Sequence, residues 1–287
     1  SALDAAKAVA LMAGQTRPLW DFEDVGDNFK RVDPAGMLPV VAVPTTAGTG
    51  SEVGRASVIT DESDHTKKII FHPGMMPGIV ISDPELTVGL PAHITAATGI
   101  DAFVHCFEAY CAPGFHPMAD GIALEGMRLV KDELPRAVAD GGNVEARARM
   151  LAAASMGAVA FQKGLGGVHA LAHPIGAVYD THHGLTNAVL LPYVMRHNRA
   201  AIAGRMDLLA RVLDLPGRGF DAVLDWTLAF RKSLKIPDTL AEIGVDAARA
   251  GEIGEMAARD PSAGGNPCPV DAAELTAIFR AAVAGSP

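Results

Sequence analysis

The pattern of apolar and polar positions changes character near residue 90. Before that point, a helix predicted over residues 1–14 precedes several short apolar runs. The run VVAV at 40–43 is typical of a buried parallel strand. After that point strand signals fade, and alanine-rich patterns with helical periodicity follow one another. The sequence therefore predicts a partial α/β domain over residues 1–89 and an all-helical domain over residues 90–287.

Further elements follow from the same pattern. Short strands are predicted at 56–61, 67–71 and 78–84, and residues 15–37 have an irregular pattern. A complete doubly wound sheet usually has about five or six strands, and this chain offers roughly half of such a sheet. We therefore expect uncovered strand edges or apolar faces that favour a homo-oligomer. The helices of the second domain are predicted at 91–112, 117–139, 144–164, 168–180, 184–197, 199–213, 219–234, 246–259 and 271–284.

Composition narrows the range of functions. The chain has 287 residues, 49% of them hydrophobic and 20% charged, which is typical of a globular protein. Its formal net charge is −9 and it has no basic run, which argues against nucleic acid as a partner. No apolar run reaches the length of a membrane span. Three scattered cysteines without a CxxC pair favour a reducing cytoplasm over a disulfide framework.

The first predicted helix of the second domain carries an acid and an imidazole at helical spacing. Asp101 and His105 in TGIDAFVHCFEAY are four residues apart, so they share one helical face and can bind one cation together. The alternative is an ordinary Asp–His pair on a helix surface. The largely apolar neighbours favour a buried position, where a carboxylate needs a partner.

The stretch GLGGVHALAHPIGAVYDTHHG at 164–184 concentrates imidazole groups. They either occupy helix ends or bind a metal. One carboxylate with two or three imidazoles suits Zn²⁺, Fe²⁺ or Ni²⁺ and is poor for Mg²⁺ or Ca²⁺. Pro174 directly follows His173 and is expected to disturb the helix that carries His169 and His173. The residues alone do not choose between His169, His173, His182 and His183.

The loop PTTAGTGSE at 44–52 is a candidate phosphate-binding loop. It follows the predicted buried strand 40–43, and α/β proteins bind ligands at the carboxyl ends of such strands. Its glycines allow close backbone approach, and its hydroxyls can donate hydrogen bonds. An ordinary surface loop of similar composition is the alternative. Ser1 is a predicted N-cap of the first helix, whose N-terminus would also suit a phosphate.

Taken together, these motifs resemble the iron-containing (group III, iron-activated) alcohol dehydrogenases. The resemblance implies a Rossmann-like dinucleotide-binding domain followed by a helical metal-binding domain, an architecture shared with dehydroquinate synthase. It also implies that most of the N-terminal domain precedes Ser1, the residue that would close a glycine-rich loop. The motifs, in family order, are PTTAGTGSEV at 44–53, DPELT at 83–87, LPAHITAATGIDAFVHCFEAY at 90–110, GLGGVHALAHPIGAVYDTHHGLTNAVLLPYVMRHN at 164–198 and GGNP at 264–267.

By this resemblance, the four histidines of the 164–184 stretch separate into different roles. His173 would line the substrate and nicotinamide pocket, and His182 has no assigned role because it replaces a usual proline. Gly54 and Cys268 also depart from common family residues. The implied metal ligands are Asp101, His105, His169 and His183. The implied cofactor contacts are Ser1, Thr45, Thr46, Thr49 and Lys68, with Lys67 as the neighbouring alternative to Lys68.

The resemblance implies a metal-dependent oxidoreductase that interconverts a small alcohol and its aldehyde or ketone. The expected cofactors are Fe²⁺, with Zn²⁺ as the alternative, and NAD or NADP. Two other hypotheses stay open at this point: a lyase like dehydroquinate synthase, and a metal-binding fragment without catalysis.

Overall fold

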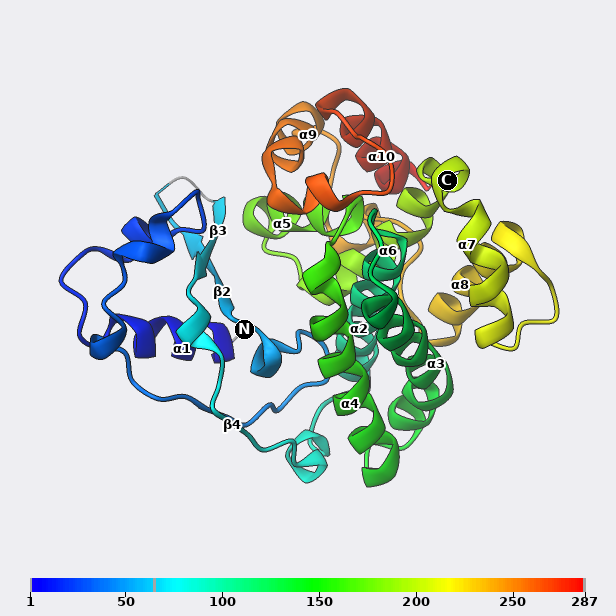
Figure 1. The fold of residues 1–287 in the computed structure, drawn as a ribbon. Helices are drawn as coiled ribbons and strands as arrows, with labels where there is room; N and C mark the ends of the chain where they lie inside the picture. The colour runs from blue at the N-terminus through cyan, green and yellow to red at the C-terminus, as the bar shows by residue number, and fades with distance from the viewer. Residues whose placement is uncertain (1, 64–65, 286–287) are drawn as a thin grey trace.

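The structure, a computed structural model, describes residues 2–63 and 66–285. An N-terminal segment, blue and cyan in Figure 1, lies beside a larger body of helices. This arrangement confirms the predicted combination of a partial α/β domain with a helical one. The elements of the N-terminal segment are α1 (Ala2–Met12), β1 (Val41–Ala42), β2 (Ala56–Asp61), β3 (Thr66–Phe71) and β4 (Ile79–Val80).

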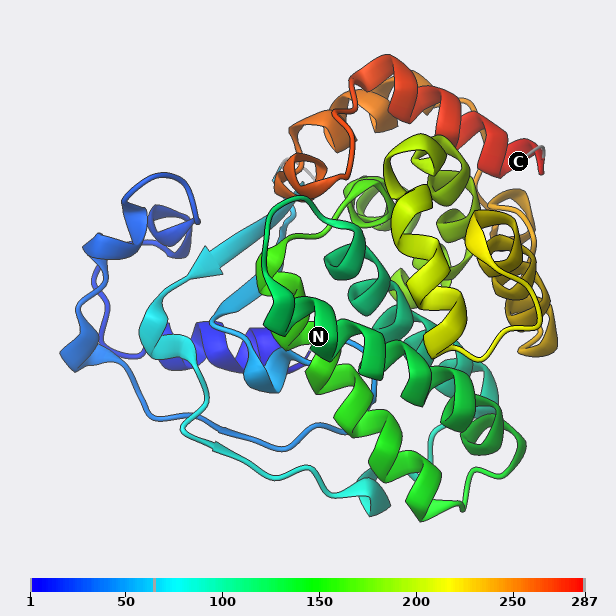
Figure 2. The same cartoon turned by 45° about the vertical axis from the view of Figure 1, so that its right-hand side comes forward.

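The strands form two small sheets. β2 and β3 make an antiparallel hairpin, whereas β1 and β4 pair in parallel with Val41 opposite Ile79. The extended segments that carry β1 and β4 run together below α1 in Figure 2. The parallel pairing agrees with the prediction for residues 40–43, but the expected burial was wrong on one face. Val41 is 54% and Ile79 58% exposed, because no described element covers their side chains.

The N-terminal segment has a small core of its own. Leu11 of α1, Phe22 and Ile70 of β3 are fully buried against one another, with Val32 and Met75 completing the cluster. Residues 15–37, predicted to be irregular, contain short 3₁₀ turns and a single β-bridge between Glu23 and Ile70. The hairpin and α1 therefore hold their relative positions through side-chain packing rather than through a large sheet.

The first helix of the helical body begins at Ala92, two residues after the predicted start of the second domain. The domain boundary itself stays a prediction. None of the described helices is both long and apolar enough to cross a membrane. The helices of the body are α2 (Ala92–Cys111), α3 (Pro117–Ala139), α4 (Val144–Ala160), α5 (Gly167–Tyr179), α6 (His183–His197), α7 (Arg199–Val212), α8 (Gly219–Ser233), α9 (Ala250–Arg259) and α10 (Ala272–Ala284).

Helix α2 is the centre of the body. It packs against α3, α4 and α6, and nearly all of its side chains from Thr95 to its end are buried. A helix that is apolar on all sides is expected to be enclosed in this way. Helix α5 continues through Pro174 to Tyr179, so the expected disturbance does not end the helix. As a result, α2, α5 and α6 bring their polar residues together inside the body.

Candidate metal centre and adjoining pocket

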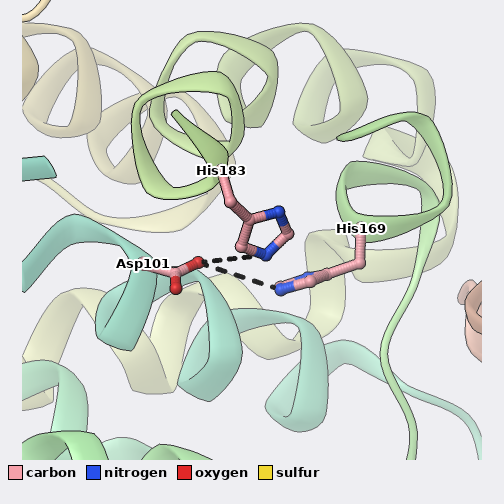
Figure 3. Close-up of side chains that lie close together, drawn as sticks. All are labelled: Asp101, His169 and His183. Atoms are coloured by element: carbon pink, nitrogen blue, oxygen red, sulfur yellow. Dashed lines mark ion pairs between the residues drawn. The ribbon is translucent and has the colours of Figure 1, made fainter. Parts of the chain in front are cut away.

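Three side chains from three helices point toward one another in the helical body. Asp101 lies on α2, His169 on α5 and His183 at the start of α6, and Figure 3 shows their side chains converging. The Asp101 Oδ1 is 3.9 Å from His169 Nε2 and 3.8 Å from His183 Nε2. Their ligand atoms all lie within 4.8 Å of one another, so one ion can reach them together. Asp101 and His169 are buried, whereas 31% of the His183 side chain is exposed.

His105 lies next to this group, one helical turn after Asp101. Its Nε2 is 4.0 Å from Asp101 Oδ1, and its ring stacks on that of His169 with centroids 4.7 Å apart. It is not part of the set whose ligand atoms all lie within 4.8 Å of one another. Its buried Nδ1 has no hydrogen-bond partner among the described residues.

The side chain of Asn187 indicates that the group suits a cation. Its Nδ2 lies 2.7 Å from Asp101 Oδ1, 3.2 Å from His169 Nε2 and 3.1 Å from His183 Nε2. An amide nitrogen has only two hydrogens for these three acceptors. A cation between the same atoms would satisfy every one of them, and a carboxylate with imidazoles is a donor set for Zn²⁺ or Fe²⁺.

The acid–base properties of the group also favour a cation. Glu108 accepts a hydrogen bond from the backbone N–H of Val168 and lies 2.6 Å from His169 Nδ1. Burial raises the pKa of Glu108 to about 7, although the N–H of Val168 opposes this shift. Burial, followed by the neighbouring His105, lowers the pKa of His169. Burial thus disfavours charge on the Glu108 carboxyl and on the His169 ring, and a divalent ion bound at His169 would offset the negative charge of the carboxylates.

A pocket with a volume of about 300 Å³ adjoins the group. His173, one turn after His169 on α5, lines it, and its ring stacks 5.5 Å from that of His183. The Nδ1 of His173 lies 2.8 Å from Asp260 Oδ2. A carboxylate at Nδ1 favours the tautomer with the proton on that nitrogen, which leaves Nε2 to hold or pass a proton. His173 therefore connects the converging group with the pocket.

Neighbouring lysines of β3 differ in their surroundings. Both line the pocket, but the Lys68 ammonium is 2.6 Å from Asp61 Oδ2 and lies over the Trp20 ring. Lys67 makes no hydrogen bond or ion pair with any described residue. Burial lowers the pKa of Lys67, and the negative charges of Asp101 and Asp260 oppose this shift. Of the two lysines, Lys67 is the one free to bind a ligand.

The candidate phosphate-binding loop joins the N-terminal segment to the helical body. Gly50 has a φ of 64°, and a Cβ there would lie 2.3 Å from the Cβ of Ala158, so only glycine allows this approach to α4. The buried Lys7 of α1 donates hydrogen bonds to the carbonyl oxygens of Ser51 and Gly54. Both ends of the loop's final turn are thus anchored. The predicted contacts Thr45, Thr46 and Thr49 are at least partly exposed.

The remaining predicted residues have simpler outcomes. His182 is the N-cap of α6, where its Nδ1 accepts a hydrogen bond from the N–H of Leu185, so this histidine does occupy a helix end. Ser1 lies outside the described residues. Three further residues of the site, Glu108, Asn187 and Asp260, were not predicted from the sequence. Helical spacing could have indicated the first two, since Glu108 follows Asp101 by seven residues and Asn187 follows His183 by four.

Comparisons with known proteins agree with this geometry. Residues 1–84 match the profile of the family described as iron-containing alcohol dehydrogenase. Residues 95–283 match that of the Fe-containing alcohol dehydrogenase family, C-terminal. A 4-hydroxybutyrate dehydrogenase from Cupriavidus necator is 42% identical over 85% of this chain, which spans 65% of that relative's length. An NAD-dependent methanol dehydrogenase from Bacillus methanolicus is 36% identical over 99% of this chain, and the match covers 75% of that relative's length.

Solved structures give the same result. The crystal structure of a 1,3-propanediol oxidoreductase superposes with a TM-score of 0.91 at 34% sequence identity. The superposition covers 98% of this chain and 74% of that one. A match of this extent includes both the N-terminal segment and the helical body.

Proposed function

The chain belongs to the iron-containing alcohol dehydrogenase family, and from this premise we propose that it interconverts a small alcohol and its aldehyde or ketone by hydride transfer with NAD or NADP. The main support is the convergence of Asp101, His169 and His183 beside the pocket that His173 lines. The relatives reported above are dehydrogenases of methanol and 4-hydroxybutyrate and an oxidoreductase of 1,3-propanediol. None of them supports a lyase.

For the metal, we propose Fe²⁺, or Zn²⁺ as the alternative. His105 would join the converging group because its Nε2 lies near Asp101 and its ring stacks on His169. When bound, such an ion supplies Lewis-acid chemistry that draws electron density from a substrate oxygen. The proposed ligands are Asp101, His105, His169 and His183.

The chain's own residues have distinct proposed tasks at the reacting end of the pocket. With Nδ1 held by Asp260, His173 would pass the substrate's hydroxyl proton through Nε2. The walls formed by α5 and α9 would orient the substrate and limit access of water. Lys67 and the loop threonines Thr45, Thr46 and Thr49 would contact the dinucleotide.

We expect the substitution Lys67→Ala to weaken NADH binding far more than Lys68→Ala. A hydrogen bond to a charged group contributes about 1.5–3 kcal/mol, so Lys67→Ala should raise the NADH dissociation constant roughly 10- to 100-fold. Lys68→Ala removes the contact with Asp61 instead and should leave the constant within about twofold. Fluorescence titration of both variants measures the difference. A larger loss with Lys68→Ala would reverse the assignment.

The proposed activity is tested with the metal-loaded chain itself. We expect NAD⁺ or NADP⁺ to be reduced to NADH or NADPH when the chain is given that cofactor, Fe²⁺ under anaerobic conditions or Zn²⁺, and an alcohol. The alcohols to test are 4-hydroxybutyrate, 1,3-propanediol, butanol and methanol. Removal of the metal by a chelator should abolish the rate. A chain that keeps its metal and yet reduces neither cofactor with any alcohol would instead be a metal-binding protein without this activity.

Two further properties belong to the same proposal. The exposed apolar side chains on β1 and β4, Val41, Ile79 and Val80, support a homo-oligomer in which a second copy covers them. The three unpaired cysteines support a reducing cytoplasm.

A further inference from the structure

Glu108 occupies a position that the proposed chemistry does not use. It lies on α2, seven residues after Asp101 and so on the same side of the helix, and only 5% of it is exposed. Its two carboxylate oxygens have different partners. Oε1 accepts the N–H of Val168 at 2.7 Å, in the first turn of α5, and Oε2 lies 2.6 Å from His169 Nδ1.

The other ring nitrogen of His169 faces the converging group. Its Nε2 lies 3.2 Å from Asn187 Nδ2 and 3.9 Å from Asp101 Oδ1, and the ring is almost completely buried. Glu108 and the candidate metal site therefore lie at opposite nitrogens of one imidazole. A neutral imidazole carries one proton, so a carboxylate that accepts this proton at Nδ1 leaves the lone pair at Nε2.

We propose that Glu108 is a positioning residue for the metal: it fixes the tautomer and ring orientation of His169 and thereby strengthens metal binding. The proposal rests on the metal site of the proposed function. Carboxylates commonly act on the outer nitrogen of a metal-binding histidine, and they make the ligand more basic. Asp101 and Glu108 would then hold the metal from one helix, the first directly and the second through a residue of α5.

The alternative is that Glu108 only caps the first turn of α5 through the N–H of Val168. The two roles respond differently to Glu108→Gln. A glutamine can keep its oxygen on the N–H of Val168, but its NH₂ group then faces His169 Nδ1. That donor favours the tautomer with a proton on Nε2, which cannot bind a metal. The variant therefore retains the cap and reverses the hydrogen bond to the histidine.

The test is the Zn²⁺ affinity of the chain, measured by competition with a chromophoric chelator. We expect Glu108→Gln to weaken Zn²⁺ binding roughly 10- to 100-fold, the usual effect of removing such a partner. The metal-free variant should unfold at nearly the same temperature as the parent. In the Co²⁺-loaded chain, the visible absorption bands should shift, because the field of one ligand changes. A role limited to capping would change neither the affinity nor the bands.

Two further variants complete the test. Glu108→Asp keeps the carboxylate but shortens it, and we expect it to recover part of the affinity. Glu133→Gln is the matched control, because Glu133 is equally buried but pairs with Arg136 of α3 and Arg149 of α4 instead of with a histidine. Affinity within about threefold of the parent for Glu108→Gln, or an equal loss for Glu133→Gln, would overturn the inference. Absence of Zn²⁺ binding by the parent would overturn the metal site as well.

Discussion

Replacement of Asp101 by alanine is expected to remove almost all bound metal. Its Oδ1 lies within 4.0 Å of an Nε2 of His105, His169 and His183, so it is the carboxylate that the imidazoles share. Loss of one partner from a buried charge pair costs about 3–5 kcal/mol, which corresponds to roughly 10²- to 10⁴-fold weaker binding. Metal analysis after gel filtration, together with chelator competition, gives the occupancy and the affinity.

The control for this prediction comes from the neighbouring HHG sequence. His182→Asn should retain the metal, because His182 caps α6 and asparagine is also a good N-cap. His183→Ala, one residue later, should reduce metal binding. Full occupancy in the Asp101→Ala chain would show that the ion is bound elsewhere. Equal losses in the His182 and His183 variants would show that the effect comes from α6 itself.

The sequence predicted most helices because their periodicity is local. The positions of Asp101 and His105 on one face of α2 follow from a spacing of four residues. The role of His182 as the N-cap of α6 was not predicted. The choice between His169 and His173 came from the family resemblance, since both lie on α5 one turn apart. Local pattern alone left that choice open.

Contacts between distant segments could not be predicted in the same way. Glu108 and His169 are 61 residues apart, and His173 and Asp260 are 87 apart. No periodicity of a helix or strand predicts a contact at such sequence separations, because the packing of separate helices decides which residues meet. The burial of Val41 was overestimated for a similar reason. An apolar strand shows that a face can be covered, whereas coverage itself depends on other elements.

The second large effect is expected from Gly184→Ala, which adds one methyl group beside the site. Gly184 is the residue after His183 in α6, and a Cβ there would lie 2.5 Å from the carbonyl oxygen of Ala97 on α2. The same Cβ would lie 3.1 Å from the Cβ of Asp101. The clash is with helix backbone, which cannot rotate away as a side chain can. Helix α6 must therefore move away from α2, and His183 moves with it.

We expect Gly184→Ala to lower the free energy of unfolding by about 1–3 kcal/mol, the usual cost of overpacking a core. Zn²⁺ affinity should fall roughly tenfold or more, although every proposed ligand is still present. Gly204→Ala is the matched control, since nothing lies within 4 Å of a Cβ at that position of α7. That variant should gain about 0.5–1 kcal/mol and bind Zn²⁺ as the parent does. Denaturant unfolding of the metal-free chains separates the loss of stability from the loss of affinity. Parent-like Zn²⁺ affinity in a destabilised Gly184→Ala chain would show that the close approach of α6 to α2 serves packing alone.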